Sequence, residues 1–164
     1  MPIQIRKMTD EEYDRFYRWS VNSYAKELME EGKQSPEEAF KTAQEEAFRM
    51  LSSARETEYH HLMSIEETIK KETVGFVWTL HEETDGKKQS FLCDFVILEP
   101  KRRQGYATAA LSFVERLAAD AGCQESVLFV ADKNYPAKAL YQKCGYQFLR
   151  QFEHGIYMVK VLTK

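Results

Sequence analysis

Apolar residues recur at three- and four-residue spacing through the first third of the chain. Before them, residues 3–5 alternate between apolar and polar side chains, which predicts a short first strand. Residues 9–12, Thr-Asp-Glu-Glu, have the form of a capping box, and the apolar positions after them predict a helix that Gly32 ends. Ser35 and Pro36 are typical of an N-cap and a first helical residue, so a second helix should follow.

Past the second predicted helix the pattern changes to that of strands. Residues 60–67, 73–83 and 90–99 are rich in apolar, β-branched and aromatic side chains. Asp85 and Gly86 lie between the last two segments and are typical of a tight turn, which predicts a hairpin. The later elements are expected in this order: a helix that begins near Gln104, has apolar positions from Ala107 to Ala121 and ends at Gly122, an apolar strand over 126–132, a short helix over 136–143, and strands over 146–152 and 156–162.

The predicted order is one strand, two helices, three strands, and then helix, strand, helix and two strands. Such an order is typical of an α/β (α+β) fold in which helices cover a mixed sheet. The strand–helix–strand piece from Phe91 to Asp132 should be parallel and right-handed. A chain of 164 residues is expected to form one domain, so we predict a single domain over residues 1–164.

Composition and charge limit the classes of partner that the protein is expected to bind. Apolar residues make up 43% of the chain and charged residues 30%, which is typical of a soluble globular protein. The formal net charge of -3 argues against nucleic acid or an anionic membrane as the main partner, because both require a basic face. The N-terminal residues show no apolar segment of a signal peptide, and no apolar run is long enough to span a bilayer. We therefore expect a cytoplasmic protein.

The three cysteines, Cys93, Cys123 and Cys144, form no C-x-x-C pattern. We interpret them as reduced thiols that pack in the interior of a cytoplasmic protein. A catalytic cysteine is the less favoured alternative.

One short segment carries candidate chemistry: Arg102, Arg103, Gln104 and Gly105 lie between a predicted strand and a predicted helix. A helix that begins near Gln104 leaves its first N–H groups without partners, and its dipole adds positive charge there. Gly105 has no Cβ, so a ligand can approach the backbone closely, and the two arginines suit phosphate oxygens. The segment is a candidate pyrophosphate site, although a solvated basic loop would have the same composition. The P-loop and dinucleotide-binding motifs are both absent from the sequence.

Two motifs, in this order, resemble those of the GNAT superfamily of acetyl-CoA-dependent N-acetyltransferases. Residues 102–107 match its [QR]-x-x-G-x-[GA] pyrophosphate loop, with Ala107 where glycine is commoner. Residues 134–146 match its N-x-x-A-x-x-L-Y-x-K-x-G-[FY] segment at every fixed position. The resemblance implies a mostly antiparallel central sheet with one splayed parallel strand pair. It also implies acetyl-CoA as the co-substrate and no metal.

The resemblance further implies how acetyl-CoA would be held. Pantetheine would lie between the splayed strands, bound by backbone groups of Val96, Ile97 and Leu98. Asn134 would contact the pantetheine, although this residue is equally expected to cap the helix that follows it. The pyrophosphate would be held by the loop and by the start of its helix, that is by Arg102, Arg103, Gln104, Gly105, Tyr106, Ala107 and Thr108.

Acetyl transfer to an amine needs groups that move protons. Tyr141 matches the family's general acid for the departing thiolate, although a core tyrosine would fit the same position. Asp94 interrupts an apolar strand and is the candidate base or amine-binding group, because a buried carboxylate is costly unless it functions or is paired. A carboxylate satisfied by backbone amides, or one at a β-bulge, is the alternative. Glu99 is a weaker rival, and a backbone N–H near Val96 or Ile97 would stabilise the oxyanion.

The sequence leaves the acceptor open. The resemblance implies a small-molecule or peptide amine, with the two N-terminal helices on the acceptor side. On the first of these helices Tyr24, Glu27 and Glu31 could line a pocket for a cationic amine, although a run of charges on a helix is usually a solvated face. His60 and His61 have no third residue at metal-ligand spacing. The family often dimerises through its last strands, which makes a homodimer an expectation to test. A non-catalytic acyl-CoA-binding or regulatory module on the same fold is the alternative function.

Overall fold

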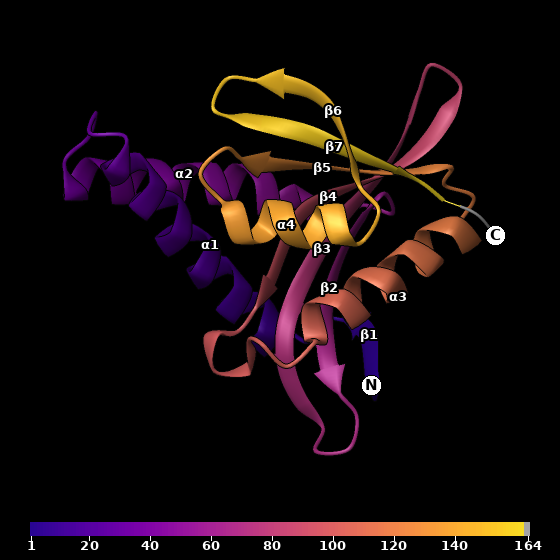
Figure 1. Cartoon of the computed structure of the whole chain (residues 1–164). Helices are drawn as coiled ribbons and strands as arrows, with labels where there is room; N and C mark the ends of the chain where they lie inside the picture. Colours follow the sequence, from indigo (N-terminus) through magenta and orange to yellow (C-terminus); the bar gives the residue numbers. More distant parts are fainter. Residues whose placement is uncertain (163–164) are drawn as a thin grey trace. The chain divides into compact units, whose positions relative to one another are not determined.

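The computed structural model describes residues 1–162, and the chain divides into two compact units (Figure 1). The sheet unit comprises residues 1–6 and the chain from Met63 onward, and the helical unit comprises Lys7–Leu62. The elements, in chain order, are β1 (Ile3–Lys7), α1 (Asp10–Glu30), α2 (Pro36–Ala54), β2 (His60–Glu67), β3 (Glu72–Thr84), β4 (Lys87–Ile97), the short 3-10 turn η1 (Glu99–Lys101), α3 (Tyr106–Asp120), β5 (Glu125–Ala131), α4 (Tyr135–Lys143), β6 (Gln147–Phe152) and β7 (Gly155–Val161). The predicted order of helices and strands is confirmed.

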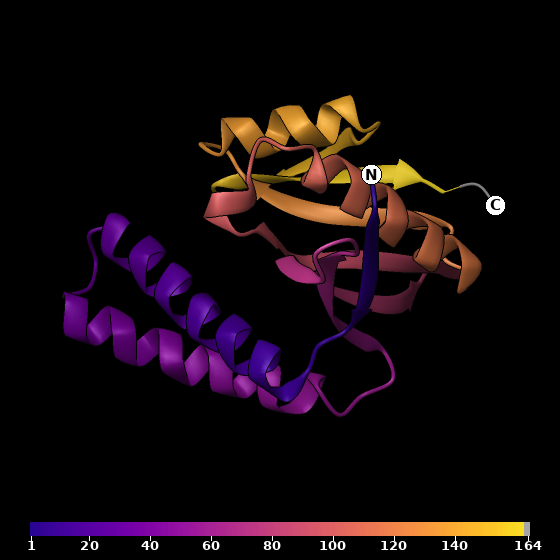
Figure 2. The same ribbon diagram turned by 90° about the horizontal axis from the view of Figure 1, so that it is seen from below.

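The helical unit is a pair of helices, α1 and α2, that lie side by side (Figure 2). Both helices begin at the predicted caps. The Thr9 hydroxyl accepts from the Glu12 N–H at 3.1 Å, and the Glu12 carboxylate accepts from the Thr9 N–H at 2.9 Å. Ser35 Oγ accepts from the Glu38 N–H at 3.2 Å. Small side chains recur at four-residue intervals among the buried positions of α2, at Ala39, Ala43 and Ala47.

Seven strands form the sheet, in the order β1-β2-β3-β4-β5-β7-β6. β3 and β4 are the predicted antiparallel hairpin, and their turn has positive φ at both Asp85 (53°) and Gly86 (78°), as the tight hairpin turn requires. β4 and β5 are the predicted parallel pair, whereas β5–β7 and β6–β7 are antiparallel. The mixed, mostly antiparallel sheet with one parallel pair is confirmed.

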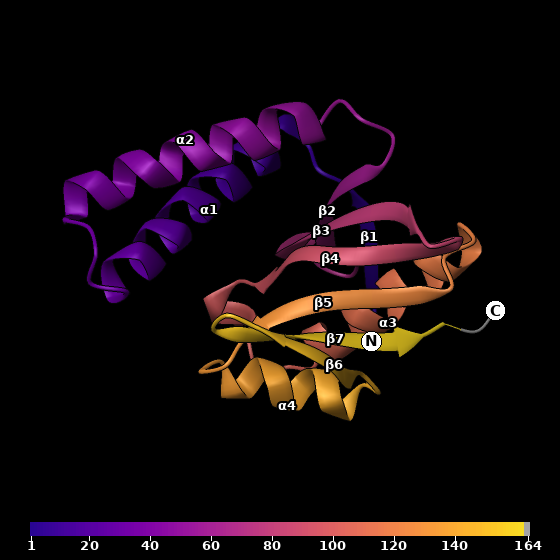
Figure 3. The same ribbon diagram turned by 90° about the horizontal axis from the view of Figure 1, so that it is seen from above.

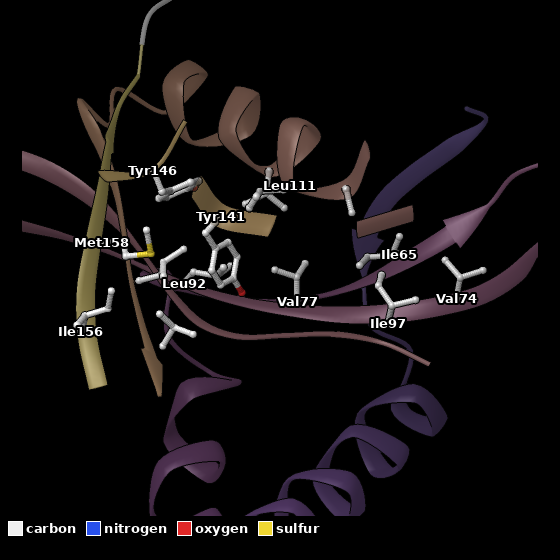
Figure 4. Packing of buried hydrophobic residues seen from close by; sticks show 14 residues of the cluster. Ile65, Val74, Val77, Leu92, Ile97, Leu111, Tyr141, Tyr146, Ile156 and Met158 are labelled. Atoms are coloured by element: carbon white, nitrogen blue, oxygen red, sulfur yellow. The ribbon is translucent and has the colours of Figure 1, made fainter. Parts of the chain in front are cut away.

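Helices α3 and α4 cover the same side of the sheet (Figure 3). The core of the sheet unit lies between them and the strands, as Figure 4 shows for Leu111 of α3, Tyr141 of α4 and Leu92 of β4. Burial of one such aliphatic side chain stabilises the fold by about 1.5–3 kcal/mol, so this cluster fixes both helices on the sheet. No helix within residues 1–162 is long and apolar enough to cross a membrane.

Helix α3 begins at Tyr106, two residues after the start expected near Gln104. The reason is backbone geometry, because Gly105 has a φ of +88° and stands outside the helix as its N-cap. Helix α4 begins one residue before the predicted Pro136, with Asn134 as its N-cap.

Candidate functional site

The parallel ladder between β4 and β5 ends before either strand does. Its register runs from Gln89–Glu125 to Leu92–Leu128, whereas β4 continues to Ile97 and β5 to Ala131. Beyond Leu92, β4 continues to pair with β3. Beyond Leu128, β5 continues to pair with β7. The strands therefore stop pairing partway, as the predicted splayed pair requires.

The peptide groups of β4 alternate in direction, so only some of its N–H and C=O groups point toward β5, where the two strands no longer pair. We call this the open side of β4. The Leu98 N–H donates to Val74 O of β3 at 2.8 Å, so that N–H points away from β5. Successive peptide groups of a strand point in opposite directions, so the N–H groups of Phe95 and Ile97 point to the β5 side. Val96 lies in register with Phe76 of β3, and its N–H points the same way as that of Leu98.

From the sequence, we expected the backbone groups of Val96, Ile97 and Leu98 to bind pantetheine. Phe95 was not among the predicted residues. The choice between alternate residues depends on which neighbouring strand takes each peptide group, and the sequence does not carry that information. The Leu98 carbonyl is also engaged, because it accepts from the Lys101 N–H at 2.8 Å.

A β-bulge at Cys93 turns Asp94 to the other face of the sheet. Trp78 lies opposite Asp94 and Thr79 lies opposite Leu92, so Cys93 is the extra residue of β4. Leu92 belongs to the core cluster on the α3/α4 side, and an unbroken strand would place Asp94 on that same face. With the bulge, Phe95 takes the core-facing position, and Asp94 shares the face of its partner Trp78.

The start of α3 presents backbone donors without a side-chain cap. Gly105 makes no capping hydrogen bond, and the first turn of α3 contains no acidic residue. The Ala109 N–H donates to Gly105 O at 3.2 Å, so the N–H groups of Tyr106, Ala107 and Thr108 precede the first intrahelical bond. A Cβ at position 105 would meet only Met1 Cε, at 3.4 Å, and its sulfur, at 3.9 Å. This geometry suits an anion held by helix N–H groups.

The loop before α3 is fastened by its own side chains. Arg102 Nε donates to Ile97 O at 2.9 Å, and Gln104 Nε2 donates to Pro100 O at 3.3 Å. Arg103 is exposed and has a φ of +63°, a backbone conformation that non-glycine residues rarely adopt. Arg102 thus has a structural role at the end of β4, in addition to the phosphate role that the resemblance implies for it.

Helix α4 carries the other two predicted site residues. Asn134 Oδ1 accepts from the Ala137 N–H at 3.3 Å, which confirms the capping alternative for this residue. Tyr141 is 9% exposed, and its ring packs edge-on against Tyr146 with 5.8 Å between ring centroids. In Figure 4 its hydroxyl points from the helix toward the strands.

Burial raises the pKa of Tyr141 to about 12, with smaller contributions from the charges of Asp94 and Cys144. The phenol is therefore protonated at neutral pH and able to donate a proton. The influence of Asp94 on this pKa indicates that the carboxylate and the phenol act on each other electrostatically, although they come from β4 and α4.

The cysteines are free thiols, and burial raises the pKa of each of them. For Cys93 the pKa reaches about 12, through burial first and then the charges of Asp94 and Glu82. A thiol with such a pKa is a poor nucleophile at neutral pH, which argues against a cysteine-bound acyl group. Within residues 1–162, no group of three or more His, Cys, Asp or Glu side chains is placed to hold a metal ion.

The sequence of the chain matches a known family. The model of the acetyltransferase (GNAT) family matches residues 11–146 of the chain, and the chain belongs to this family. The protein is therefore an acyltransferase of the N-acetyltransferase class.

Relatives with this class in their names span nearly the whole chain. The uncharacterized N-acetyltransferase YycN of Bacillus subtilis (strain 168) is 31% identical over 147 residues, which cover 90% of this chain and 94% of YycN. YdgE of the same organism, also named an uncharacterized N-acetyltransferase, is 29% identical over 146 residues, which cover 89% of this chain and 92% of YdgE.

Solved structures share the fold. A crystal structure of YycN superposes with a TM-score of 0.82 at 29% identity and covers 92% of this chain and 95% of that one. The spermidine N-acetyltransferase from Vibrio cholerae, in complex with CoA and spermine, superposes with a TM-score of 0.71 at 15% identity and covers 98% of this chain and 96% of that one. At 15% identity the likeness concerns the fold alone.

Proposed function

We propose that the protein transfers the acetyl group of acetyl-CoA to a primary amine by direct attack within a ternary complex. The observation that carries the proposal is the open end of the β4–β5 ladder beside the uncapped start of α3, two donor sets that suit the two halves of CoA. The Vibrio cholerae spermidine N-acetyltransferase, whose structure contains CoA, supports a CoA donor for this fold.

The donor set of the chain fits acetyl-CoA. Pantetheine carries amides, which the gap-facing backbone groups of Phe95 and Ile97 would bind as a further strand would. The pyrophosphate would accept from the N–H groups at residues 106–108, with the exposed Arg103 as a counter-charge. Acetyl-CoA supplies an activated acetyl thioester, and the remaining chemistry falls to side chains of this chain.

Asp94 is the proposed base or amine-binding group. An alkylamine with a pKa of about 10 is almost fully protonated at pH 7, so a nearby carboxylate that accepts or relays its proton favours attack. The Phe95 and Ile97 N–H groups both point to the open side of β4. One of them would stabilise negative charge on the acetyl oxygen, while the other would bind pantetheine. Glu99 lies in η1, outside the bulged stretch, and is the weaker candidate.

Tyr141 is the proposed proton donor to the departing thiolate. Its pKa of about 12 lies above that of a free thiol, about 8.5, so donation from the resting site is unfavourable. The charge of Asp94 is one of the causes of that raised pKa. When Asp94 takes up the proton of the amine, this charge disappears and the pKa of Tyr141 falls. The two proton movements therefore assist each other.

The remaining properties follow from the same proposal. We treat residues 1–164 as one catalytic domain that acts on a small-molecule or peptide amine in the cytoplasm and requires no metal. A homodimer would form through the last strands, of which β6 is the edge of the sheet and is exposed along its whole length. Light scattering during gel filtration measures this association directly.

The experiment that tests the proposal measures CoA release in the presence of acetyl-CoA and a panel of amines. The panel should include polyamines, amino acids, peptides with free N-termini and lysine-containing peptides. We expect amine-dependent CoA release that Tyr141→Phe reduces. Saturable binding of acetyl-CoA without CoA release for any amine would instead favour the non-catalytic module.

A further inference from the structure

Lys160 on β7 joins the two helices that carry the proposed site. Its Nζ donates to Glu115 Oε1 of α3 at 2.8 Å and to the carbonyl oxygen of Cys144, the C-cap of α4, at 2.8 Å. The side chain of Glu115 is 11% exposed and that of Lys160 is 30% exposed. The half-buried side chain of Lys160 therefore connects α3 to the end of α4 through its ammonium group.

The bond from Lys160 to the Cys144 carbonyl lies at the C-terminal turn of α4, whose N–H groups bond to the Tyr141 carbonyl. The N–H groups of Cys144 and Tyr146 donate to the Tyr141 carbonyl at 3.1 Å and 2.9 Å. Gly145 between them has a φ of +99°, and a Cβ there would lie 3.4 Å from Lys160 Cε. A cation at a helix C-terminus also neutralises carbonyl groups that have no intrahelical partner. Lys160 thus holds the turn that fixes the backbone of Tyr141.

A second set of contacts leads to the ring of Tyr141. The Tyr146 hydroxyl and Ser126 Oγ of β5 share a buried hydrogen bond of 2.7 Å. The Tyr146 ring lies edge-on to Tyr141, and Lys160 Nζ lies 6.0 Å from the Tyr146 ring centroid. Figure 4 shows the two tyrosines adjacent on the inner side of the helices. A displacement of Lys160 would therefore change the positions of both the backbone and the ring of Tyr141.

We propose that Lys160 is a positioning residue for acetyl transfer: its bridge between Glu115 and the Cys144 carbonyl holds the Tyr141 hydroxyl where it can donate its proton. The proposal rests on the proposed function. Proton transfer depends on hydrogen-bond geometry, and a displacement of about 1 Å can lower a rate by roughly a hundredfold.

The chain offers a matched control in Lys88 of β4. Lys88 Nζ donates to the carbonyl oxygen of Ala121, the C-cap of α3, at 2.6 Å. The chemistry is the same, a lysine bonded to the end of a helix, but the helix end is not the one that follows Tyr141. Lys88→Met removes such a bond without disturbing α4.

The test compares Lys160→Met with Lys88→Met, each in the wild-type protein and in Tyr141→Phe. We expect Lys160→Met to lower kcat about 10- to 100-fold and to change the KM for acetyl-CoA less than about twofold. In the Tyr141→Phe background it should lower kcat by no more than about twofold, because the group it positions is already gone. Lys88→Met should leave kcat within about twofold in both backgrounds.

An unchanged kcat in Lys160→Met, or the same fall in both backgrounds, would overturn the proposal. Hydrogen exchange of the full-length variants gives a readout that is independent of turnover. Lys160→Met should exchange faster across residues 135–143, and Lys88→Met should not; unchanged exchange there also overturns the proposal. If the wild-type protein shows no turnover, the proposed function fails, while exchange still decides whether Lys160 holds α4.

If Lys160→Met does not fold, Glu115→Gln replaces it in the test. This variant keeps an oxygen acceptor but removes the charge that holds the ammonium group. We expect kcat to fall about two- to fivefold, again only when Tyr141 is present. A fall of equal size in Tyr141→Phe contradicts the proposal.

Discussion

A carboxylate at the start of α3 should impair acetyl-CoA binding without unfolding the protein. Gly105→Asp places the charge at the uncapped helix start, and Gly86→Asp in the β3–β4 turn is the matched control. Both glycines have left-handed backbones, with φ of +88° and +78°, and a Cβ meets only Met1 at position 105 and nothing within 4 Å at position 86. A non-glycine residue in this conformation costs about 1–2 kcal/mol, so the two variants should lose similar stability.

The effects on binding should differ. Two unit charges about 4 Å apart repel by about 4 kcal/mol at an effective dielectric constant of 20. Gly105 is exposed, and salt reduces the repulsion further, so about 1.4–2.8 kcal/mol is a reasonable expectation at moderate ionic strength. This corresponds to a rise in the Kd for acetyl-CoA of about 10- to 100-fold for Gly105→Asp.

Calorimetric titration of both variants with acetyl-CoA measures the difference, and denaturant unfolding checks that their stabilities match. A repeat at high salt should narrow the gap between the two Kd values, because the repulsion is electrostatic. Equal Kd values for Gly105→Asp and Gly86→Asp would refute the assignment of the pyrophosphate to the start of α3.

Three further results are expected. Tyr141→Phe should lower kcat about 10²- to 10⁴-fold with little change in the KM for acetyl-CoA; an equal loss of binding, seen in the same steady-state kinetics, would indicate a purely structural tyrosine. Joint replacement of Cys93, Cys123 and Cys144 by alanine should leave turnover of the folded protein intact, because burial raises the pKa of all three thiols; its abolition would point to a cysteine-bound acyl group. Burial raises the pKa of Tyr141 to about 12 and also raises that of Tyr146, above the unfolded value of about 10. The stability that both phenols contribute is therefore complete below pH 10 and is lost at higher pH, by about 1.4 kcal/mol per pH unit for each phenol. Denaturant unfolding between pH 8 and 11 should show a shallower decline for Tyr146→Phe than for the wild-type protein, and parallel declines would contradict this cause.

Local signals in the sequence were sufficient for most of the fold. Helix starts at Thr9 and Ser35 were predictable because each cap is a short-range hydrogen bond between neighbouring residues. The β3–β4 hairpin was predictable because Asp85 and Gly86 tolerate the positive φ values of its turn. The start of α3 was misplaced by two residues because the left-handed conformation of Gly105 excludes it from the helix.

The site was less predictable, because its details depend on pairing between strands. The bulge at Cys93 reverses the facing of Asp94. A carboxylate within an apolar strand made a β-bulge one alternative for Asp94, but the residue pattern does not identify which residue of β4 is the extra one. The bond from Arg102 to the Ile97 carbonyl likewise depends on how the loop returns to the strand. Lys160 appeared in the sequence only as one polar position of the last strand, and its two partners lie 16 and 45 residues away.

Thermal stability of the protein with saturating acetyl-CoA, compared with CoA, NAD and ATP, is the most direct test of whether the chain binds acetyl-CoA. A ligand at about a hundred times its Kd adds ~2.7 kcal/mol, and each kcal/mol raises the Tm of a chain of this size by about 2–4 °C. We expect a rise in Tm of about 5–11 °C with acetyl-CoA, a comparable rise with CoA, and much smaller changes with NAD and ATP. No rise with either form of CoA, or an equal rise with NAD or ATP, would contradict this expectation.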